Sequence, residues 1–228
     1  KMKKQNSIDV SENEIMVTIG GGEALSLAIQ SSIKTGDGVI VPSPAFVAYV
    51  PTVMLSGGIP IEVECKEDEN FILNPELLEE KITEKTELLI LNSPSNPTGA
   101  VMSKNDLEKI SDIIMEYNLK VISDEVYESL IYDGKKHVSM ASLNGMEENV
   151  ITVNSFSKTY SMTGWRVGYL SSKDESLFDR MLKLHMYGPV CNNTFAQFGA
   201  LEALKGPQHF IDNMRDEFRD RRDLLLKR

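Results

Sequence analysis

Short apolar runs alternate along the chain with longer stretches in which apolar residues recur every three or four positions. The runs have the length of buried strands, and they lie near residues 15–17, 38–41, 59–63, 87–91, 119–123, 150–154 and 166–170. The stretches between them have the periodicity of helices that bury one face. This alternation predicts an α/β fold of the doubly wound type, in which a mostly parallel sheet lies between two layers of helices.

Several of the predicted helices have recognisable starts. Ser103 has the position of an N-cap for a helix that runs through Met115, and Asp106 stands three residues later, as in a capping box. Asn74 and Pro75 have the N-cap and N1 positions of another helix. Three further amphipathic stretches begin at Asp174, Asn193 and Pro207.

A run of glycines follows the first apolar run. Gly20, Gly21 and Gly22 separate the predicted strand from a helical pattern that continues through Ile33. Glycine lacks a Cβ atom, so the backbone N–H groups of Gly21 and Gly22 can approach an anion, and the helix start adds a positive dipole end. The run is neither a P-loop nor a dinucleotide fingerprint. It predicts a phosphate cradle, with low specificity when taken alone.

Two further strands end in polar residues. The run 88–91 stops in the turn from Ser93 to Gly99, which contains Asn96, and the run 119–123 stops at Asp124. The carboxyl ends of parallel strands meet at one edge of a sheet, where α/β proteins bind ligands. Asn96 and Asp124 are therefore candidate ligand-binding residues. The alternatives are a turn-forming asparagine and an aspartate that caps the next helix.

Lys158 lies in a segment rich in hydroxyl groups, Ser155-Phe156-Ser157-Lys158-Thr159-Tyr160-Ser161-Met162-Thr163-Gly164-Trp165-Arg166. A lysine amine is a weak nucleophile while protonated, so covalent chemistry with a carbonyl needs a site that favours the neutral amine and fixes the carbonyl beside it. Ser155 and Arg166 are suited to fixing such a molecule by gripping a phosphate. An isolated Ser-x-x-Lys is more often an ordinary surface loop, and the other three segments favour the functional interpretation.

Together these four segments resemble the fold-type I pyridoxal-phosphate enzymes, in particular the class I/II aminotransferase family typified by aspartate and aromatic aminotransferases. The resemblance depends on Gly20 to Leu25, Ser93 to Gly99, Ser123 to Tyr127 and Ser155 to Tyr169, which occur in the family's order. It covers nearly the whole chain. It implies an aminotransferase that moves an amino group between an L-amino acid and a 2-oxo acid.

The resemblance assigns roles around the ring of the cofactor, pyridoxal 5'-phosphate. Lys158 is expected to form the Schiff base with the cofactor and to move the proton between the substrate α-carbon and C4′. Asp124 is expected to keep the pyridine nitrogen protonated. Tyr127 and Asn96 are expected to hydrogen-bond the phenolic oxygen. Phe46 matches the aromatic residue that stacks on the ring, with core packing as the alternative.

The resemblance also implies which residues bind the phosphate group of the cofactor. The backbone N–H groups of Gly21 and Gly22, the Ser155 hydroxyl and the Arg166 guanidinium are expected to bind it, with Ser157 as a possible extra contact. No metal site is expected. By the same resemblance, the Ser43–Pro44 and Asn96–Pro97 peptide bonds are candidates for the cis form.

Family members are considerably longer than this chain, so we expect residues 1–228 to form a single cofactor-binding large domain. Residues 207–228 are then the start of a long helix that leads to a C-terminal small domain, where the arginine that binds the substrate carboxylate is expected. The charge-dense run 215–222 predicts a solvent-exposed helix face with i,i+4 ion pairs. The chain as given is expected to bind pyridoxal phosphate weakly or moderately and to transaminate little.

The composition of the chain limits the partners and the cellular compartment that we expect for it. The net charge of −10, from 34 acidic and 24 basic residues, argues against nucleic-acid binding. Cys65 and Cys191 are far apart, which predicts two free thiols in a reducing compartment, and no signal peptide or membrane-spanning run is visible. The cytoplasm is the expected location. His137, His185 and His209 form no pattern with cysteine or carboxylate, which favours packing or surface roles.

Three functions remain compatible with the sequence. The first is an amino-acid aminotransferase, with aspartate or aromatic substrates and 2-oxoglutarate as reasonable substrates. The second directs the same cofactor chemistry to elimination, as in carbon–sulfur lyases and aminocyclopropane-carboxylate synthases. The third is the cofactor-sensing domain of a transcription regulator. The family is usually dimeric, so a homodimer is expected, in which the stretch from Tyr187 to Asn193 approaches the partner's cofactor.

Overall fold

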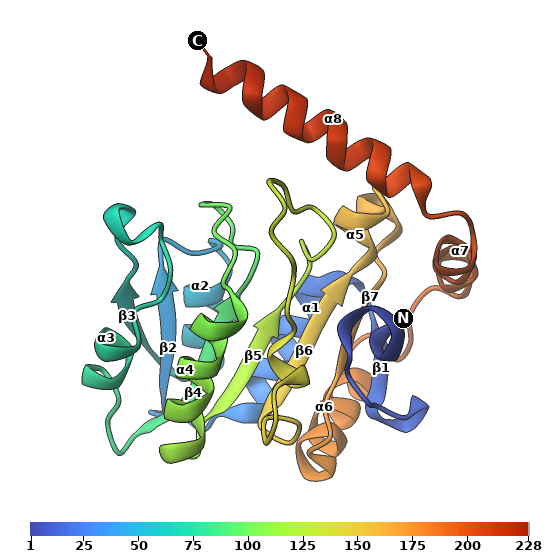
Figure 1. Cartoon of the computed structure of the whole chain (residues 1–228). Coiled ribbons are helices and arrows are strands. Elements are labelled where there is room, and N and C mark those ends of the chain that lie inside the picture. Colours follow the sequence, from blue (N-terminus) through green and yellow to red (C-terminus); the bar gives the residue numbers. More distant parts are fainter. Residues whose placement is uncertain (228) are drawn as a thin grey trace.

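A single seven-stranded sheet forms the centre of the molecule (Figure 1). The computed structural model describes residues 1–227. The strands are β1 (Ile15–Thr18), β2 (Gly38–Ser43), β3 (Ile59–Glu64), β4 (Thr86–Asn92), β5 (Lys120–Asp124), β6 (Val150–Ser155) and β7 (Gly168–Ser171). Their order across the sheet is β1-β7-β6-β5-β4-β2-β3, and β7 is antiparallel to both of its neighbours while the other pairs are parallel.

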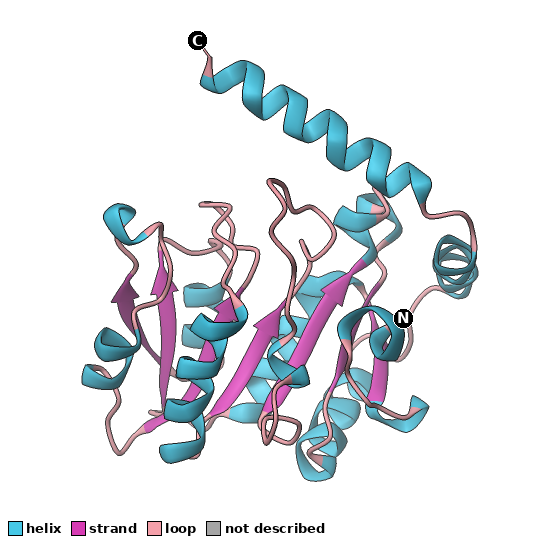
Figure 2. Ribbon diagram, in the orientation of Figure 1, coloured by secondary structure: helices cyan, strands magenta, loops and turns pink. Residues whose placement is uncertain are grey.

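Residues 1–227 form eight α-helices, and the last of them projects away from the sheet (Figure 2). They are α1 (Gly20–Ser32), α2 (Tyr49–Leu55), α3 (Pro75–Glu80), α4 (Lys104–Glu116), α5 (Phe156–Thr159), α6 (Glu175–Tyr187), α7 (Thr194–Lys205) and α8 (His209–Leu226). Short π or 3-10 turns cover Met2–Asn6, Glu12–Glu14, Glu67–Glu69, Met140–Ser142 and Thr163–Trp165. Over residues 1–227, no helix is long and apolar enough to cross a membrane.

The two faces of the sheet carry separate hydrophobic cores. Ile90 of β4 packs in one core with Ala28 of α1, whereas the next residue, Leu91, packs in the other core with Ile110 of α4. This alternation follows from the two-residue period of a strand. Figure 1 accordingly shows α4 in front of the sheet and α1 behind it. The predicted three-layer α/β arrangement is confirmed.

The strands that carry polar residues end at the same edge of the sheet. Strands β2, β4, β5 and β6 are parallel, and they end at Ser43, Asn92, Asp124 and Ser155. Strand β1 has the same direction as β6, because both are antiparallel to β7. The glycine run at the start of α1 therefore lies at this edge as well.

Four of the five predicted helix starts are confirmed, namely Asn74, Ser103, Asp174 and Asn193. The helix expected from Pro207 begins two residues later, at His209. The Ser103 backbone N–H donates to Asp106 Oδ2 at 2.8 Å, and the Asp106 backbone N–H donates to Ser103 Oγ at 3.2 Å, which completes a capping box. Asn74 Oδ1 accepts from the backbone N–H of Glu76 at the start of α3. In α8, the ion pair between Arg221 and Glu217 has the expected i,i+4 spacing.

Some local features differ from the prediction. Strand β7 begins at Gly168 and not at residue 166, because Arg166 has a left-handed backbone with φ of 55°. Helices α2 and α5 were not predicted, since they span only 7 and 4 residues. The Ser43–Pro44 and Asn96–Pro97 bonds are cis, as predicted, and Ser93–Pro94 is a third cis bond.

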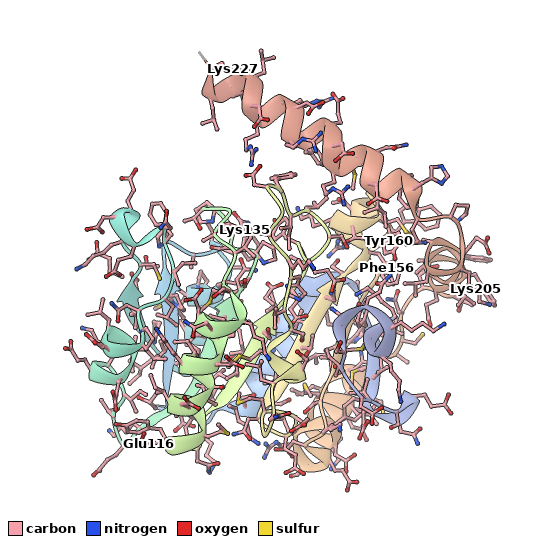
Figure 3. All side chains as sticks on the ribbon, viewed as in Figure 1. Glu116, Lys135, Phe156, Tyr160, Lys205 and Lys227 are labelled. Atoms are coloured by element: carbon pink, nitrogen blue, oxygen red, sulfur yellow. The ribbon has the colours of Figure 1, made fainter. Side chains whose placement is uncertain are left out.

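Helix α8 projects from the body of the molecule (Figure 1), and it contacts the body through its first two turns and again near its end. Near its start, Phe210 packs on Tyr160 with ring centroids 6.1 Å apart, and Figure 3 shows Tyr160 beside α5. Near its end, Arg222 binds both carboxylate oxygens of Asp133, at 2.7 and 2.9 Å. Asp133 lies in the loop between β5 and β6, the loop that also carries Lys135, which is labelled in Figure 3.

Gly168 lets β7 approach the glycine run very closely. A Cβ atom added at Gly168 would lie 2.6 Å from the carbonyl carbon of Gly20 and 2.8 Å from the nitrogen of Gly21. These are backbone atoms, so no side-chain rotation can relieve the contact. The position of the glycine run is therefore fixed against the sheet by the absence of a side chain at residue 168.

We expect Gly168→Ala to destabilise the protein by about 1–3 kcal/mol, because the added methyl group forces backbone apart in a packed interior. Urea unfolding measures the change in free energy. Gly164→Ala is the matched control, since a Cβ at Gly164 meets no atom within 4 Å. Equal effects of the two substitutions would show that the close approach at Gly168 does not matter for stability.

Candidate active site

A cavity of about 260 Å³ lies at the carboxyl edge of the sheet. All ten residues predicted for the site line it, namely Gly21, Gly22, Phe46, Asn96, Asp124, Tyr127, Ser155, Ser157, Lys158 and Arg166. Five further residues that were not predicted complete the lining, namely Leu25, Tyr49, Asn92, Val126 and Thr163. Residues from widely separated parts of the chain thus meet around one space, although their chemical roles remain predictions.

Lys158 enters the cavity from α5, the short helix that directly follows β6. Ser155 is the N-cap of this helix, and its hydroxyl accepts from the backbone N–H of Ser157 at 3.2 Å. The Lys158 side chain is exposed, and its Nζ atom lies 5.6 Å from the centre of the Tyr127 ring. Asn96 donates to the Tyr127 hydroxyl at 3.4 Å. The amine, the phenol and the amide thus converge on one wall of the cavity.

Asp124 presents a buried carboxylate to the cavity from the end of β5, with only 3% of the residue exposed. The Tyr49 hydroxyl donates to its Oδ2 atom at 2.7 Å, and the backbone N–H of Val126 donates to Oδ1 at 3.3 Å. Burial raises the pKa of Asp124 to about 6, even though both hydrogen bonds favour the charged form. Among residues 1–227, no cation forms a salt bridge with this carboxylate. A positively charged group bound in the cavity would fit it.

The start of α1 offers unsatisfied amides. Its N-cap residue is Ile19, which has no side-chain acceptor, and the N-cap makes no side-chain hydrogen bond. In most helices a serine, threonine or aspartate occupies this position and accepts from the N2 or N3 amide. Here the N–H groups of Gly21 and Gly22 remain available where the helix dipole favours an anion.

Arg166 and the two serines complete a set of donors. The Arg166 guanidinium donates to the carbonyl oxygens of Thr163 at 3.0 Å and Ile19 at 3.4 Å. It makes no salt bridge within the part of the chain that the structure describes. Ser155 and Ser157 place their hydroxyls beside the glycine run. A guanidinium, two hydroxyls and helix-terminal amides without an acidic partner fit a phosphate group.

Tyr49 and Asn92 are two of the five lining residues that were not predicted, and both make hydrogen bonds with predicted site residues. Tyr49 follows Phe46 by three positions, packs edge to face on it at 5.6 Å and reaches Asp124 with its hydroxyl. Asn92 ends β4; its Oδ1 accepts from the backbone N–H of Asn96, and its Nδ2 donates to the Asp124 carbonyl. The polar end of β4 was a usable signal for Asn92, but the sequence gives no sign that Tyr49 contacts β5.

Two of the three histidines pair with carboxylates, which the sequence analysis did not predict. His137 Nε2 lies 2.9 Å from Glu125 Oε2, and His185 Nδ1 lies 2.8 Å from Glu23 Oε1. Burial disfavours the charged imidazolium of His137, but the hydrogen bond and charge of Glu125 outweigh burial and raise the pKa of His137. The second pair joins segments 162 positions apart, whereas the first closes the connection between β5 and β6 on itself.

Comparison with known proteins identifies the family of this chain. The family described as "Aminotransferase class I and II" matches residues 1–228. The chain is 48% identical to an aspartate aminotransferase of Pyrococcus abyssi and 44% identical to aromatic-amino-acid aminotransferase 2 of Thermococcus litoralis. Each match covers 100% of this chain and 59% of the relative, so the chain spans about three fifths of the length of these proteins.

Solved structures agree with this relationship. An aromatic aminotransferase from Pyrococcus horikoshii is 47% identical with a TM-score of 0.97, over 100% of this chain and 61% of that one. An aspartate aminotransferase from Thermus thermophilus, solved with maleate, is 38% identical with a TM-score of 0.96. This match covers 100% of this chain and 59% of that one. The chain belongs to the class I and II aminotransferase family. Enzymes of this family depend on pyridoxal 5'-phosphate, which agrees with the donor set and the buried acid of the cavity.

We expect Asp124→Asn to make the protein without cofactor more stable above pH 6. The pKa of Asp124 is about 6, whereas an ordinary aspartic acid titrates near 3.8, so the folded state holds a proton that the unfolded state has lost. Wild-type stability should therefore fall as the pH rises from about 4 to 6, by about 3 kcal/mol in total. The asparagine variant lacks this loss. Chemical denaturation at pH 4 and pH 8 measures the difference between the two proteins.

Tyr49→Phe is the matched control for this effect. It removes the hydroxyl that donates to Asp124 and should raise the pKa of Asp124 further, which moves the loss of stability to higher pH. A wild-type protein and an asparagine variant with the same pH dependence would contradict the assignment of the titration to Asp124.

Proposed function

We propose that the protein is a pyridoxal-phosphate-dependent aminotransferase that transfers an amino group between an L-amino acid and a 2-oxo acid. One observation carries the proposal. An exposed lysine amine, a buried carboxylate and a set of anion donors surround the same cavity in a chain of the aminotransferase family. The names of the relatives support aspartate or aromatic amino acids as substrates, with 2-oxoglutarate as the acceptor.

The residues around the reacting atoms have separate tasks. When bound, the cofactor supplies an aldehyde that reacts with amines and a pyridine ring that withdraws electrons. Lys158 would hold the cofactor through its Nζ atom, and the same amine would move a proton between the substrate α-carbon and C4′ of the cofactor. Asp124 keeps the ring nitrogen protonated, because a carboxylate buried without a cation favours a positive partner.

The remaining lining residues orient the cofactor. Tyr127 and Asn96, which hydrogen-bond each other, approach the phenolic oxygen. Phe46 would lie against a face of the ring, and its own orientation is supported by the edge-to-face contact with Tyr49. Gly21, Gly22, Ser155, Ser157 and Arg166 bind the phosphate. Binding at these separate points fixes the aldehyde beside Lys158, which lowers the entropic part of the barrier.

We also propose that this chain corresponds to the cofactor-binding domain of such an enzyme. The relatives are longer, and α8 extends away from the sheet with Leu224, Leu225 and Leu226 exposed (Figure 1). By itself the chain is then expected to bind the cofactor weakly or moderately and to have little transaminase activity. The two cysteines form no disulfide, which supports a reducing compartment and hence the cytoplasm.

A homodimer is part of the proposal. The segment from the end of α6 to α7 exposes large apolar side chains, with Tyr187 86% exposed and Phe195 84% exposed. Large exposed apolar residues mark interaction surfaces. A second copy of the chain would cover this segment and bring the stretch from Tyr187 to Asn193 near the partner's cavity.

We expect Phe195→Asp to shift the protein from dimer to monomer, because a charge in an apolar interface is left without a partner. Sedimentation velocity over a range of concentrations measures the change. Phe218→Asp on α8 is the matched control, since this phenylalanine is also exposed but lies outside the segment. A wild-type protein that stays monomeric at high concentration would contradict the proposed homodimer.

Lys158→Ala tests the proposed cofactor chemistry. With pyridoxal phosphate, the wild-type protein should gain a near-visible absorbance band that borohydride reduction makes permanent, and the variant should not. Transamination by the full-length enzyme should fall on the order of 10³-fold, the scale of a lost general acid/base group. Lys104→Ala is the matched control, because Lys104 is exposed on α4 and pairs with Glu108.

The same assay separates the alternatives. Amino-acid substrates that yield 2-oxo acids without loss of a side-chain group support transamination. Release of a thiol or of ammonia would instead indicate an elimination enzyme, and cofactor binding without turnover in the full-length protein would favour a sensing domain. A band that persists in Lys158→Ala would contradict the role of Lys158.

A further inference from the structure

A carboxylate outside the cavity accepts a hydrogen bond from the backbone N–H group that directly precedes the glycine run. Glu23 lies in the first turn of α1, and its Oε2 atom accepts from the backbone N–H of Ile19 at 2.5 Å. Ile19 is the N-cap residue, and its own side chain accepts nothing. Glu23 thus satisfies the amide that precedes the helix and leaves the amides of Gly21 and Gly22 for a ligand.

His185 holds the same carboxylate from a neighbouring helix. Its Nδ1 atom lies 2.8 Å from Glu23 Oε1, and the two side chains are only 10% and 14% exposed. His185 lies in the last turn of α6, which packs against α1 in the same hydrophobic core. Neither Glu23 nor His185 lines the cavity. The pair therefore acts on the cavity only through Ile19 and the first turn of α1.

The Ile19 peptide links this pair to the arginine of the phosphate site. The N–H group of Ile19 donates to Glu23, and its carbonyl accepts from Arg166 Nη2 at 3.4 Å. One residue thus connects the acid, the glycine run and the guanidinium. A rotation of the Ile19 backbone would move both the amides and the arginine that are expected to bind the phosphate.

We propose that Glu23 and His185 form a positioning pair that keeps the glycine run and Arg166 arranged for the phosphate group of the cofactor. The inference rests on the proposed function. It adds two residues that touch neither the cofactor nor the substrate. A capping serine at position 19 would compete with the ligand for the N2 and N3 amides. An acid that reaches back from the first turn to the N-cap amide avoids this competition.

The pair also joins α1 to α6, so a purely structural role has to be distinguished from positioning. Pyridoxal offers the distinction, because it has the ring and aldehyde of the cofactor but no phosphate. A general loss of folding would lower the affinity of the protein for both ligands. Loss of positioning should lower only the affinity for the ligand that has a phosphate.

The experiment measures the affinity of the full-length protein for pyridoxal phosphate, for pyridoxal and for inorganic phosphate as a competitor. Glu23→Ala should lower the affinity for pyridoxal phosphate and for inorganic phosphate about tenfold each, which is the scale of one charge-assisted hydrogen bond. The affinity for pyridoxal should stay within about twofold of the wild-type value. Glu23→Gln keeps an acceptor for Ile19 and should retain most of the affinity. Glu175→Ala, an exposed acid in the first turn of α6, is the matched control.

A double-mutant cycle tests the pairing. His185→Leu should give the same selective loss, and combining it with Glu23→Ala should add little, since the two residues act as a unit. Equal losses for pyridoxal phosphate and pyridoxal, no loss in Glu23→Ala, or fully additive losses would overturn the inference. A wild-type protein that binds no pyridoxal phosphate would overturn the proposed function, and the inference with it.

Discussion

Parallel strands leave their carboxyl ends at one edge of a sheet, and every polar group of the cavity depends on this constraint. Strands β4, β5 and β6 end at Asn92, Asp124 and Ser155, each at the point where hydrogen bonding to the neighbouring strand stops. The two apolar layers that sandwich the sheet hold these ends in place. Groups that are far apart along the chain therefore line one cavity.

The lining of the cavity contains both a buried acid and a set of groups that favour an anion. Asp124 is a buried acid in the lining, Arg166 and the amides of α1 are donors in the same lining, and Lys158 on α5 is an exposed amine. A net charge of −10 gives no hint of this arrangement. The overall charge describes the surface that faces water, but the chemistry depends on a few groups whose surroundings are partly desolvated.

Much of the fold and the site could be predicted from the sequence because the signals were local. The strands, the caps at Ser103 and Asn74 and the glycine run are patterns within a few residues. The contact of Tyr49 with Asp124 and the pair of Glu23 with His185 join residues 75 and 162 positions apart. Such contacts arise from how helices pack on the sheet, and no single segment of sequence specifies them.

Helix α8 contacts two segments of the chain that lead to the cavity. Through Phe210 it contacts Tyr160, which directly follows the short helix that carries Lys158, and through Arg222 it binds the loop whose first part carries Tyr127. The two anchor points lie more than three turns apart on one rigid rod. Because one helix is joined to the segment that follows Lys158 and to the loop that carries Tyr127, the orientation of α8 is tied to the relative placement of the amine and the phenol.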